Sequence, residues 1–143
     1  MTIRYFRIYF APDLNDRLNL DTMHYLITGG AGFIGSNLIR HLFATEKKVS
    51  ITCLDDFDPF YSEEIKQLNI SEFKHNPDFR LLNDDISKIS PNGLAEKIGS
   101  PVDAIVHLAA KAGVRPSILN PLSYQQANVI GLQNLLDFAK ETK

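Results

Sequence analysis

Short apolar runs alternate along the chain with longer stretches of helical periodicity. The short runs are rich in aliphatic and β-branched residues and end at glycine or at charged residues, as buried strands do. They predict four strands, at residues 25–28, 49–54, 79–82 and 104–108. Apolar residues at helical spacing predict helices at 33–46 and 63–73, another after Pro91, and a long one from Pro121 or Leu122 to about Lys140. The apolar side is expected to hold Ile65, Leu68 and Ile70 in the second helix, and Leu132, Leu135, Leu136 and Ala139 in the last.

The stretch AAKAGVRPSILNP, at residues 109–121, contains two prolines and a glycine, and it predicts a loop. Strands that alternate with helices of this length favour βαβ units and a parallel sheet. Right-handed crossovers then give the strand order 3-2-1-4. The predicted fold class is therefore α/β: a Rossmann-like doubly wound parallel sheet, truncated after the fourth strand and its helix.

Composition adds mainly exclusions. The chain has 143 residues, 44% hydrophobic and 22% charged, which suits one globular domain. A net charge of −2 gives no reason to expect nucleic acid or an anionic membrane as a partner. No apolar run approaches the ~20 residues that span a bilayer. The single cysteine, Cys53, excludes an intrachain disulfide, and the scattered histidines lack metal-ligand spacing, so no metal is expected. The composition fits a cytoplasmic protein.

The strongest motif is TGGAGFIG at residues 28–35, between the first predicted strand and the first predicted helix. Gly29 allows a tight turn off the strand, Gly32 lets the backbone approach a pyrophosphate, and Gly35 lets the helix pack closely on the sheet. The helix N-terminus then offers free N–H groups and the positive end of its dipole to phosphate. The motif therefore predicts a dinucleotide site.

An acidic residue follows where the ribose of a dinucleotide requires one. Asp55 lies twenty positions after Gly35, at the end of the second predicted strand. Its carboxylate can accept hydrogen bonds from ribose hydroxyls and repels a 2′-phosphate, which favours NAD over NADP. No basic residue occupies positions 54–60, which supports the same choice. Asp56 is the competing candidate for this role.

Several segments together resemble the extended short-chain dehydrogenases/reductases, within the NAD-dependent epimerase/dehydratase family. These are TGGAGFIGSNLIRHL, LDDF at 54–57, DDI at 84–86 and NVIGLQNLLDFAK. HLAAKAGVRPS at 107–117 and DDFDPFYSEEIKQLNISEF are most similar to the UDP-glucuronate epimerases. The resemblance covers residues 23–143, which are therefore taken as an NAD-binding Rossmann half-domain, preceded by an N-terminal extension at 1–22.

The resemblance implies a role for particular residues. It places the pyrophosphate at the glycine turn and the adenosine ribose at Asp55, and it gives Asp85 and Ile86 as the border of the adenine. The central part of the cofactor would lie along the loop after the fourth strand, and a nucleotide sugar would enter near Arg115 and Ser117. The implied cofactor-binding residues are Gly29, Gly32, Phe33, Ile34, Gly35, Asp55, Asp85, Ile86, Leu108, Ala109, Ala110 and Lys111.

Each of these assignments has a simpler alternative. Ile86 can be a plain core residue, and Asp85 can cap the segment that follows it. Lys111 can be a solvated surface charge, and Arg115 can pair with a nearby carboxylate. Asn128 resembles a family asparagine that lies near the active site, but it can also simply bridge backbone groups.

Two further residues favour structural roles. His107, in an apolar strand, is more readily a satisfied core histidine than a catalytic base. Cys53 is more readily a small core residue than a nucleophile.

The chemistry implied by the resemblance is transient oxidation of the sugar by NAD, which needs a Tyr-x-x-x-Lys pair. None of the five tyrosines is followed four positions later by lysine. No catalytic residue is therefore assigned, and the chain alone is expected to be inactive. Three hypotheses remain: the NAD-binding portion of a nucleotide-sugar epimerase acting on UDP-glucuronate, a fragment of a nucleotide-sugar 4,6-dehydratase, or a non-catalytic NAD-binding association module.

A sheet that stops at its fourth strand would leave an open edge, and its last helix would expose apolar residues. We therefore expect a homo-oligomer formed through that strand edge or the long helix. The strand-prone residues between Ile3 and Phe10 are an alternative cover for the edge.

Overall fold

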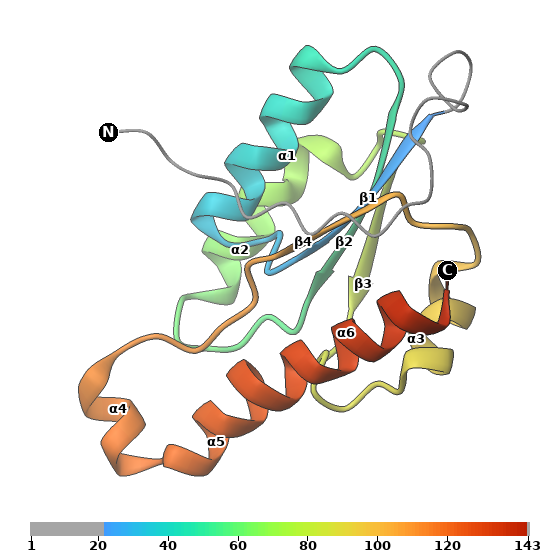
Figure 1. Ribbon diagram of the computed structural model, residues 1–143. Helices are drawn as coiled ribbons and strands as arrows, with labels where there is room; N and C mark the ends of the chain where they lie inside the picture. Colours follow the sequence, from blue (N-terminus) through green and yellow to red (C-terminus); the bar gives the residue numbers. More distant parts are fainter. Residues whose placement is uncertain (1–21, 143) are drawn as a thin grey trace, which may run out of the picture.

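The computed structural model describes residues 22–142, and these form a four-stranded parallel sheet with helices on both faces (Figure 1). The strands are β1 (Met23–Thr28), β2 (Val49–Asp55), β3 (Phe79–Asn83) and β4 (Ala104–His107). They lie in the order β3-β2-β1-β4, and every pairing is parallel. The predicted strand order and fold class are confirmed. Residues 1–21, which include the expected edge cover between Ile3 and Phe10, lie outside the described residues.

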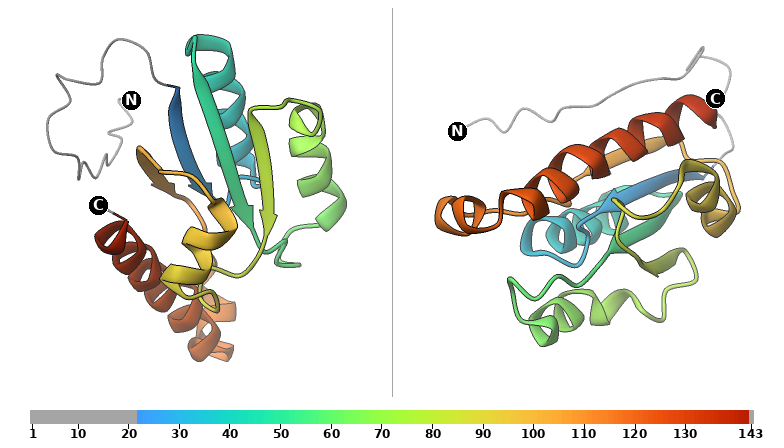
Figure 2. Two further views of the ribbon diagram at one scale, coloured as in Figure 1. Left: turned by 90° about the vertical axis from the view of Figure 1, so that its right-hand side faces the viewer. Right: turned by 90° about the horizontal axis from the view of Figure 1, so that it is seen from below.

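Two hydrophobic clusters hold the layers together. On one face, α1 (Phe33–Thr45) and α2 (Glu63–Ile70) cover the sheet (Figure 2). On the other face lie α3 (Pro91–Ile98) and α6 (Gly131–Glu141). Alternate strand residues serve the two sides: Ile27 belongs to the first cluster and Leu26 to the second. The strands are apolar on both sides because both faces are covered.

Helix α2 turns a different side to the core from the one predicted. It is followed by a 3₁₀ turn, η1 (Ser71–Phe73), and its buried side holds Lys66, Ile70 and Phe73 at helical spacing. Ile65 and Leu68, expected inside, are exposed. The apolar pattern gave the wrong side because a polar residue, Lys66, occupies one of the inward positions, where it pairs with a buried carboxylate.

The segment predicted as a loop contains a short helix, α4 (Val114–Leu119). Pro116 is its third residue, where the missing N–H removes no helical hydrogen bond. The prolines therefore mark the starts of helices here and do not exclude them: Pro121 opens α5 (Pro121–Gln125) in the same way.

The long last helix is continuous but irregular. A π turn, η2 (Gln126–Ile130), joins α5 to α6. The buried stripe of α6 is Gly131, Leu135 and Phe138, whereas Leu132 and Leu136 are exposed, so the predicted apolar side was only partly correct. Gly131 sets this orientation, because a Cβ there would lie 3.0 Å from Cγ2 of Ile86.

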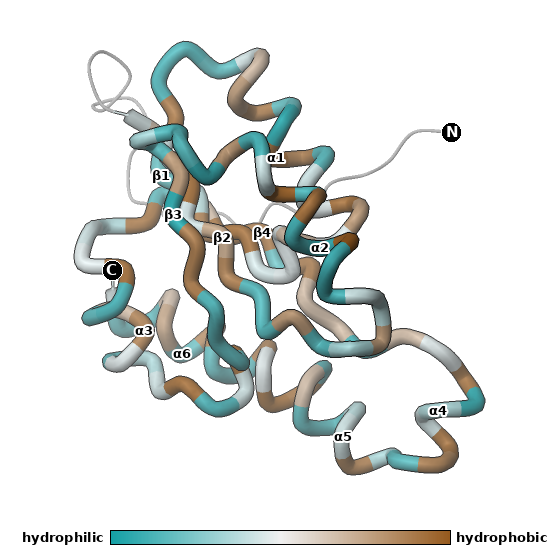
Figure 3. The backbone as a smooth tube through the Cα atoms, turned by 180° about the vertical axis from the view of Figure 1, so that it is seen from behind, coloured by the Kyte–Doolittle hydropathy of each residue, from teal (hydrophilic) through white to brown (hydrophobic). Residues whose placement is uncertain are grey.

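Strand β4 forms one edge of the sheet within the described residues, and all four of its residues are half-buried. Beyond it, α4 and α5 extend away from the sheet and carry apolar segments (Figures 1 and 3). No helix among residues 22–142 is long and apolar enough to cross a membrane.

Candidate dinucleotide site

The turn after β1 depends on Gly29 for two reasons. Its φ of +69° lies in the left-handed region, which favours glycine. A Cβ at this position would also lie 2.7 Å from the amide nitrogen of Ala109 and 2.8 Å from the carbonyl carbon of Leu108. Gly29 therefore lets the loop after β4 approach the turn, so that two strand ends meet at one place.

Gly35 and Gly32 have different surroundings. A Cβ at Gly35 would lie 2.4 Å from the carbonyl oxygen of Gly29 and 2.6 Å from Cα of Gly30, so the first turn of α1 rests directly on the glycine turn. A Cβ at Gly32 would approach only the Gly29 oxygen, at 3.2 Å, and otherwise faces open space. The backbone at Gly32 is thus open to a ligand, whereas Gly35 is enclosed by protein.

The N-terminus of α1 has no side-chain cap. Its N-cap is Gly32, and the first N–H to reach back is that of Ser36, which donates to the Gly32 carbonyl. The N–H groups of Phe33, Ile34 and Gly35 therefore have no intrahelical partner. Phe33 and Ile34 are 80% and 68% exposed, and the first turn holds no acidic residue. This terminus fits a phosphate group.

Asp55 ends β2 beside this turn and is only 4% exposed. One carboxylate oxygen accepts the N–H of Ala31 at 3.0 Å, and the other accepts the N–H of Phe57 at 2.9 Å. Phe57 adopts a left-handed φ of 53°, which turns the chain back toward the carboxylate. Asp56, the competing candidate, is exposed and accepts the N–H of Asp58. Asp55 is thus the acidic residue that lies against the glycine turn.

Helix α2 supplies two contacts that sequence reasoning missed. The ammonium of Lys66 lies 3.0 Å from Oδ1 of Asp55, and Lys66 is only 8% exposed. Asn69 donates its side-chain amide to the Ala31 carbonyl at 2.9 Å. The available signal was the shared helix face of Lys66, Ile70 and Phe73, which places a cation on a buried stripe.

The loop after β4 is held by Thr28 and Asn128. The Thr28 hydroxyl accepts the N–H groups of Leu108 and Ala109 at 3.2 and 3.3 Å, and it lies 2.7 Å from Nδ1 of His107. Burial lowers the pKa of His107. These contacts match the structural role expected for His107.

Asn128 bridges backbone groups, the simpler of its two alternatives. Its side-chain oxygen accepts the Lys111 N–H at 2.7 Å, and its amide donates to the Lys111 carbonyl at 3.0 Å. Tyr124 donates its hydroxyl to the Ala112 carbonyl at 2.6 Å. Helix α5 and the π turn η2 thus shape the loop in which Lys111 lies, next to Ala110.

The Lys111 side chain is paired with a carboxylate. Its ammonium donates to Asp58, on the loop after β2. Burial opposes ionisation of Asp58, but hydrogen bonds from Lys111 and Phe60 outweigh it and lower the pKa of that carboxyl. The same hydrogen bond raises the pKa of Lys111. This ion pair links the loops after β2 and β4.

The loop after β3 holds the predicted adenine border. Asp85 accepts the N–H and hydroxyl of Ser87 at 2.9 and 2.7 Å and pairs with Lys88. Burial opposes ionisation of Asp85, but the Ser87 and Lys88 hydrogen bonds lower its pKa. Ile86 is buried and belongs to the second hydrophobic cluster, and Asn134 donates to its carbonyl at 2.9 Å. Both residues therefore have structural roles in this loop.

The two residues predicted at the mouth of the site lie on α4. Arg115 is exposed, and Ser117 donates its hydroxyl to the Val114 carbonyl at 2.7 Å. Helix α4 lies beyond the end of the sheet (Figure 1), so these residues stand apart from the glycine turn.

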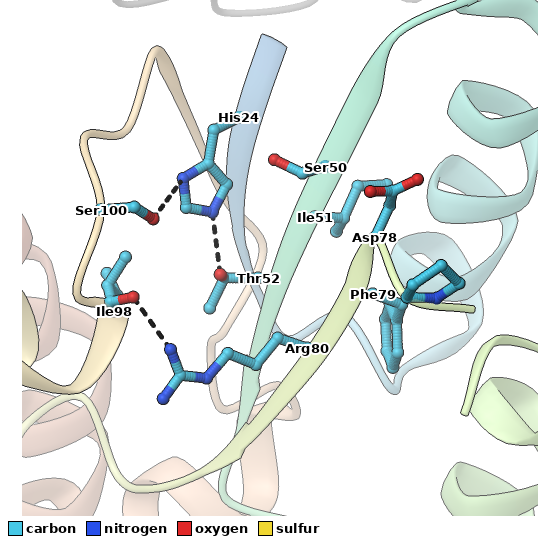
Figure 4. A pocket seen from close by; sticks show the side chains of 10 residues that line it. His24, Ser50, Ile51, Thr52, Asp78, Phe79, Arg80, Ile98 and Ser100 are labelled. Carbon is cyan, nitrogen blue, oxygen red and sulfur yellow. Dashed lines mark hydrogen bonds between the residues drawn. The ribbon is translucent and has the colours of Figure 1, made fainter. Parts of the chain in front are cut away.

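A polar pocket of about 160 Å³ lies at the opposite, amino edge of the sheet (Figure 4). His24 contacts Thr52 at 2.9 Å and the Pro101 carbonyl at 2.7 Å, and Arg80 donates to the Ile98 carbonyl at 2.9 Å. The His24 and Arg80 side chains thus each have hydrogen-bond partners within the protein, and the pocket is remote from the glycine turn. Among residues 22–142, no group of three or more His, Cys, Asp or Glu side chains could hold a metal ion.

The parallel sheet, the glycine turn and the uncapped helix define a Rossmann-type dinucleotide-binding fold. The sequence profile of the GDP-mannose 4,6 dehydratase family matches residues 26–143. The chain belongs to this family of NAD-dependent epimerases and dehydratases.

Individual relatives include both kinds of enzyme. The chain is 33% identical to the UDP-glucuronate 4-epimerase of Thermodesulfobacterium geofontis, covering 82% of this chain and 36% of that protein. It is 36% identical to part of an Arabidopsis thaliana trifunctional enzyme whose activities include UDP-glucose 4,6-dehydratase, covering 82% of this chain and 17% of that protein.

A crystal structure from Bacillus cereus shows the same fold. It is a UDP-glucuronic acid 4-epimerase in complex with UDP-glucuronic acid and NAD, with a TM-score of 0.72 and 31% identity. The match covers 85% of this chain and 37% of that one. The chain thus spans about a third of the length of this epimerase and of the T. geofontis one.

Proposed function

We propose that this chain is the NAD-binding portion of a nucleotide-sugar epimerase. One observation carries the proposal: the uncapped N-terminus of α1 lies beside an acidic residue, Asp55, at the end of β2. The first feature suits a pyrophosphate, and the second suits the adenosine ribose. The Bacillus cereus relative, solved with NAD, supports the same cofactor.

Within this proposal the site residues act in four groups. Gly32 and the N–H groups of Phe33, Ile34 and Gly35 hold the pyrophosphate, at the turn whose shape depends on Gly29 and Gly35. Asp55 binds the ribose. The adenine lies near Asp85 and Ile86; the rest of the cofactor follows Leu108, Ala109, Ala110 and Lys111. When bound, NAD supplies a hydride acceptor for the sugar.

The proposed substrate is UDP-glucuronate, or a close nucleotide sugar, which would enter near Arg115 and Ser117. The similarity to UDP-glucuronate 4-epimerases supports this choice. A 4,6-dehydratase is the second candidate, supported by the Arabidopsis relative. The chain contains no Tyr-x-x-x-Lys pair, so we expect no turnover from this chain alone.

Calorimetric titration with NAD tests the proposal. We expect saturable binding that weakens in Gly32→Ala, because a Cβ there would enter the space given to the pyrophosphate. Glu72→Gln is the matched control, since Glu72 pairs with Arg40 on the outer surface. A folded chain that does not bind NAD would refute the proposed site. Epimerisation of UDP-glucuronate by the purified chain would refute its inactivity.

A non-catalytic association module is favoured by one further observation. The helices after β4 expose a run of large apolar side chains: Val114, Ile118, Leu119, Leu122, Val129, Ile130, Leu132 and Leu136. Such a surface marks an interaction site, and we propose that two copies of the chain associate through it or through the β4 edge.

Light scattering after size exclusion tests this association. The double variant Leu132→Ser, Leu136→Ser should be monomeric if the copies associate through the apolar surface, and unchanged if they associate through the β4 edge. Ile65→Ser, Leu68→Ser on α2 should leave the assembly unchanged in both cases. A monomeric wild-type chain would contradict the proposal. A cytoplasmic location remains a prediction from composition, to be tested by fractionation of the producing cells.

A further inference from the structure

The carboxylate given to the ribose does not stand alone. Lys66 is a buried residue of α2, and its ammonium lies 3.0 Å from Oδ1 of Asp55. Both side chains are almost fully buried, with side-chain exposures of 10% and 3%. The ribose end of the site therefore presents an ion pair, not an isolated negative charge.

The hydrogen-bonding capacity of the pair is unevenly used. A carboxylate offers about four acceptor positions, and Asp55 already fills three, with the N–H groups of Ala31 and Phe57 and with Lys66. An ammonium has about three donors. Lys66 uses one on Asp55, and its Nζ lies 5.9 Å from the centroid of the Phe57 ring. Lys66 therefore has about two donors that are not used on Asp55, whereas Asp55 has only about one acceptor position left.

This changes the electrostatics expected for the cofactor's 2′ position. An unpaired Asp55 would repel a 2′-phosphate, and the segment 54–60 contains no basic residue to offset it. Folding brings Lys66 to this point from eleven positions further along the chain. The other carboxylates on the loop after β2 are Asp56, which is exposed, and Asp58, which is paired with Lys111. No further buried negative charge on this loop opposes a phosphate.

We propose that Lys66 is a specificity-determining residue for the cofactor: paired with Asp55, it lets the site accept a 2′-phosphate as well as a 2′-hydroxyl. This rests on the proposed dinucleotide function. In the NAD complex, one ribose hydroxyl donates to Asp55 and its neighbour accepts from Lys66. In the NADP complex, the Lys66 ammonium faces the phosphate. The chain then prefers NAD only weakly over NADP.

A purely structural Lys66 would behave differently. Its loss would weaken NAD and NADP binding by the same factor, because both need the same loop conformation. The ratio of the two dissociation constants, NADP over NAD, therefore separates the two roles. Lys66→Gln suits the measurement, since its amide can still donate to Asp55 and so sustain the fold.

The ratio is measured by calorimetry for the wild type and three variants. We expect Lys66→Gln to raise the ratio about tenfold, since a charge-assisted hydrogen bond to the phosphate is lost and the Asp55 charge is uncovered. Lys66→Arg should stay within about twofold of the wild type, because the charge is kept. Lys97→Gln is the matched control: it removes an equal charge from the exposed pair with Asp84. An unchanged ratio in Lys66→Gln overturns the inference.

Salt dependence in the wild type tests the same point without any variant. Screening weakens whichever net interaction the 2′-phosphate meets. If Lys66 attracts it, raising salt from about 50 to about 500 mM increases the NADP-over-NAD ratio. If the Asp55 charge dominates, the ratio decreases, and the inference is wrong. A wild-type chain that binds neither nucleotide refutes the proposed function itself, and the inference with it.

Discussion

Gly35 is expected to matter for the stability of the fold, and Gly32 for the binding of the cofactor. Substitution by alanine at each position tests this difference. At Gly35 a Cβ would lie 2.4 Å from the Gly29 oxygen and 2.6 Å from Cα of Gly30. Ordinary contacts are about 3.5–4.0 Å, so α1 and the turn must separate by roughly 1 Å. Both neighbours are backbone, and no side chain can rotate away to relieve the contact.

The magnitude follows from two opposing effects. Overpacking of this kind costs up to about 3 kcal/mol. Alanine recovers about 1 kcal/mol of helix propensity relative to glycine. Gly35→Ala should therefore lower the free energy of unfolding by about 2 kcal/mol, which corresponds to a fall in melting temperature of roughly 8 °C. Gly32→Ala meets one contact at 3.2 Å at a φ of −71°, and replacing glycine at an N-cap costs only about 0.5–1 kcal/mol.

The assay is urea unfolding followed by circular dichroism, paired with an NAD titration of each folded variant. Gly32→Ala should remain close to wild type in stability and lose at least about tenfold in NAD affinity, as expected when one phosphate contact is lost. The main effect of Gly35→Ala should be the lower free energy of unfolding. Equal stability of Gly35→Ala and wild type would refute the packing of α1 on the turn. Wild-type NAD affinity in Gly32→Ala would refute the placement of the pyrophosphate.

Three further outcomes follow from single contacts. Asn128→Ala removes both hydrogen bonds to the Lys111 backbone and should cost about 1–2 kcal/mol of stability, whereas Gln133→Ala, on the exposed side of α6, should cost little. The pKa of Asp58 is lowered and that of Lys111 raised. Their ion pair therefore stabilises the fold at neutral pH, and stability curves of wild type and Asp58→Asn should converge as pH falls below 3.8 or rises above 10.5. Burial, with the nearby carboxylate charge, raises the pKa of the Cys53 thiol to about 12, so a thiol reagent at about pH 8 should label it only after unfolding, and rapid labelling of the native chain would contradict its burial.

The strand order and the glycine turn were predictable because both depend on short stretches of sequence. Apolar runs that end at glycine give the strands, and the handedness of crossovers then gives the order. The glycine spacing likewise carries its own geometry: Gly29, Gly32 and Gly35 each take the place that their spacing indicates.

The partners of the site residues were not predictable in the same way. Lys66 reaches Asp55 only because α2 turns its less apolar side inward, and Asp58 meets Lys111 across two different loops. Such contacts depend on how elements pack, which single-sequence periodicity does not contain. For the same reason α6 buries Phe138 in place of Leu132 and Leu136.

Titration of the ¹⁵N-labelled chain with NAD, followed by amide correlation spectra, tests the central claim most directly. The account predicts that the amide signals of Phe33, Ile34 and Gly35 shift most and saturate together, because their N–H groups are the donors without partners at the start of α1. Shifts confined to the pocket around His24 and Ser100, or no shifts in a folded chain, would contradict it.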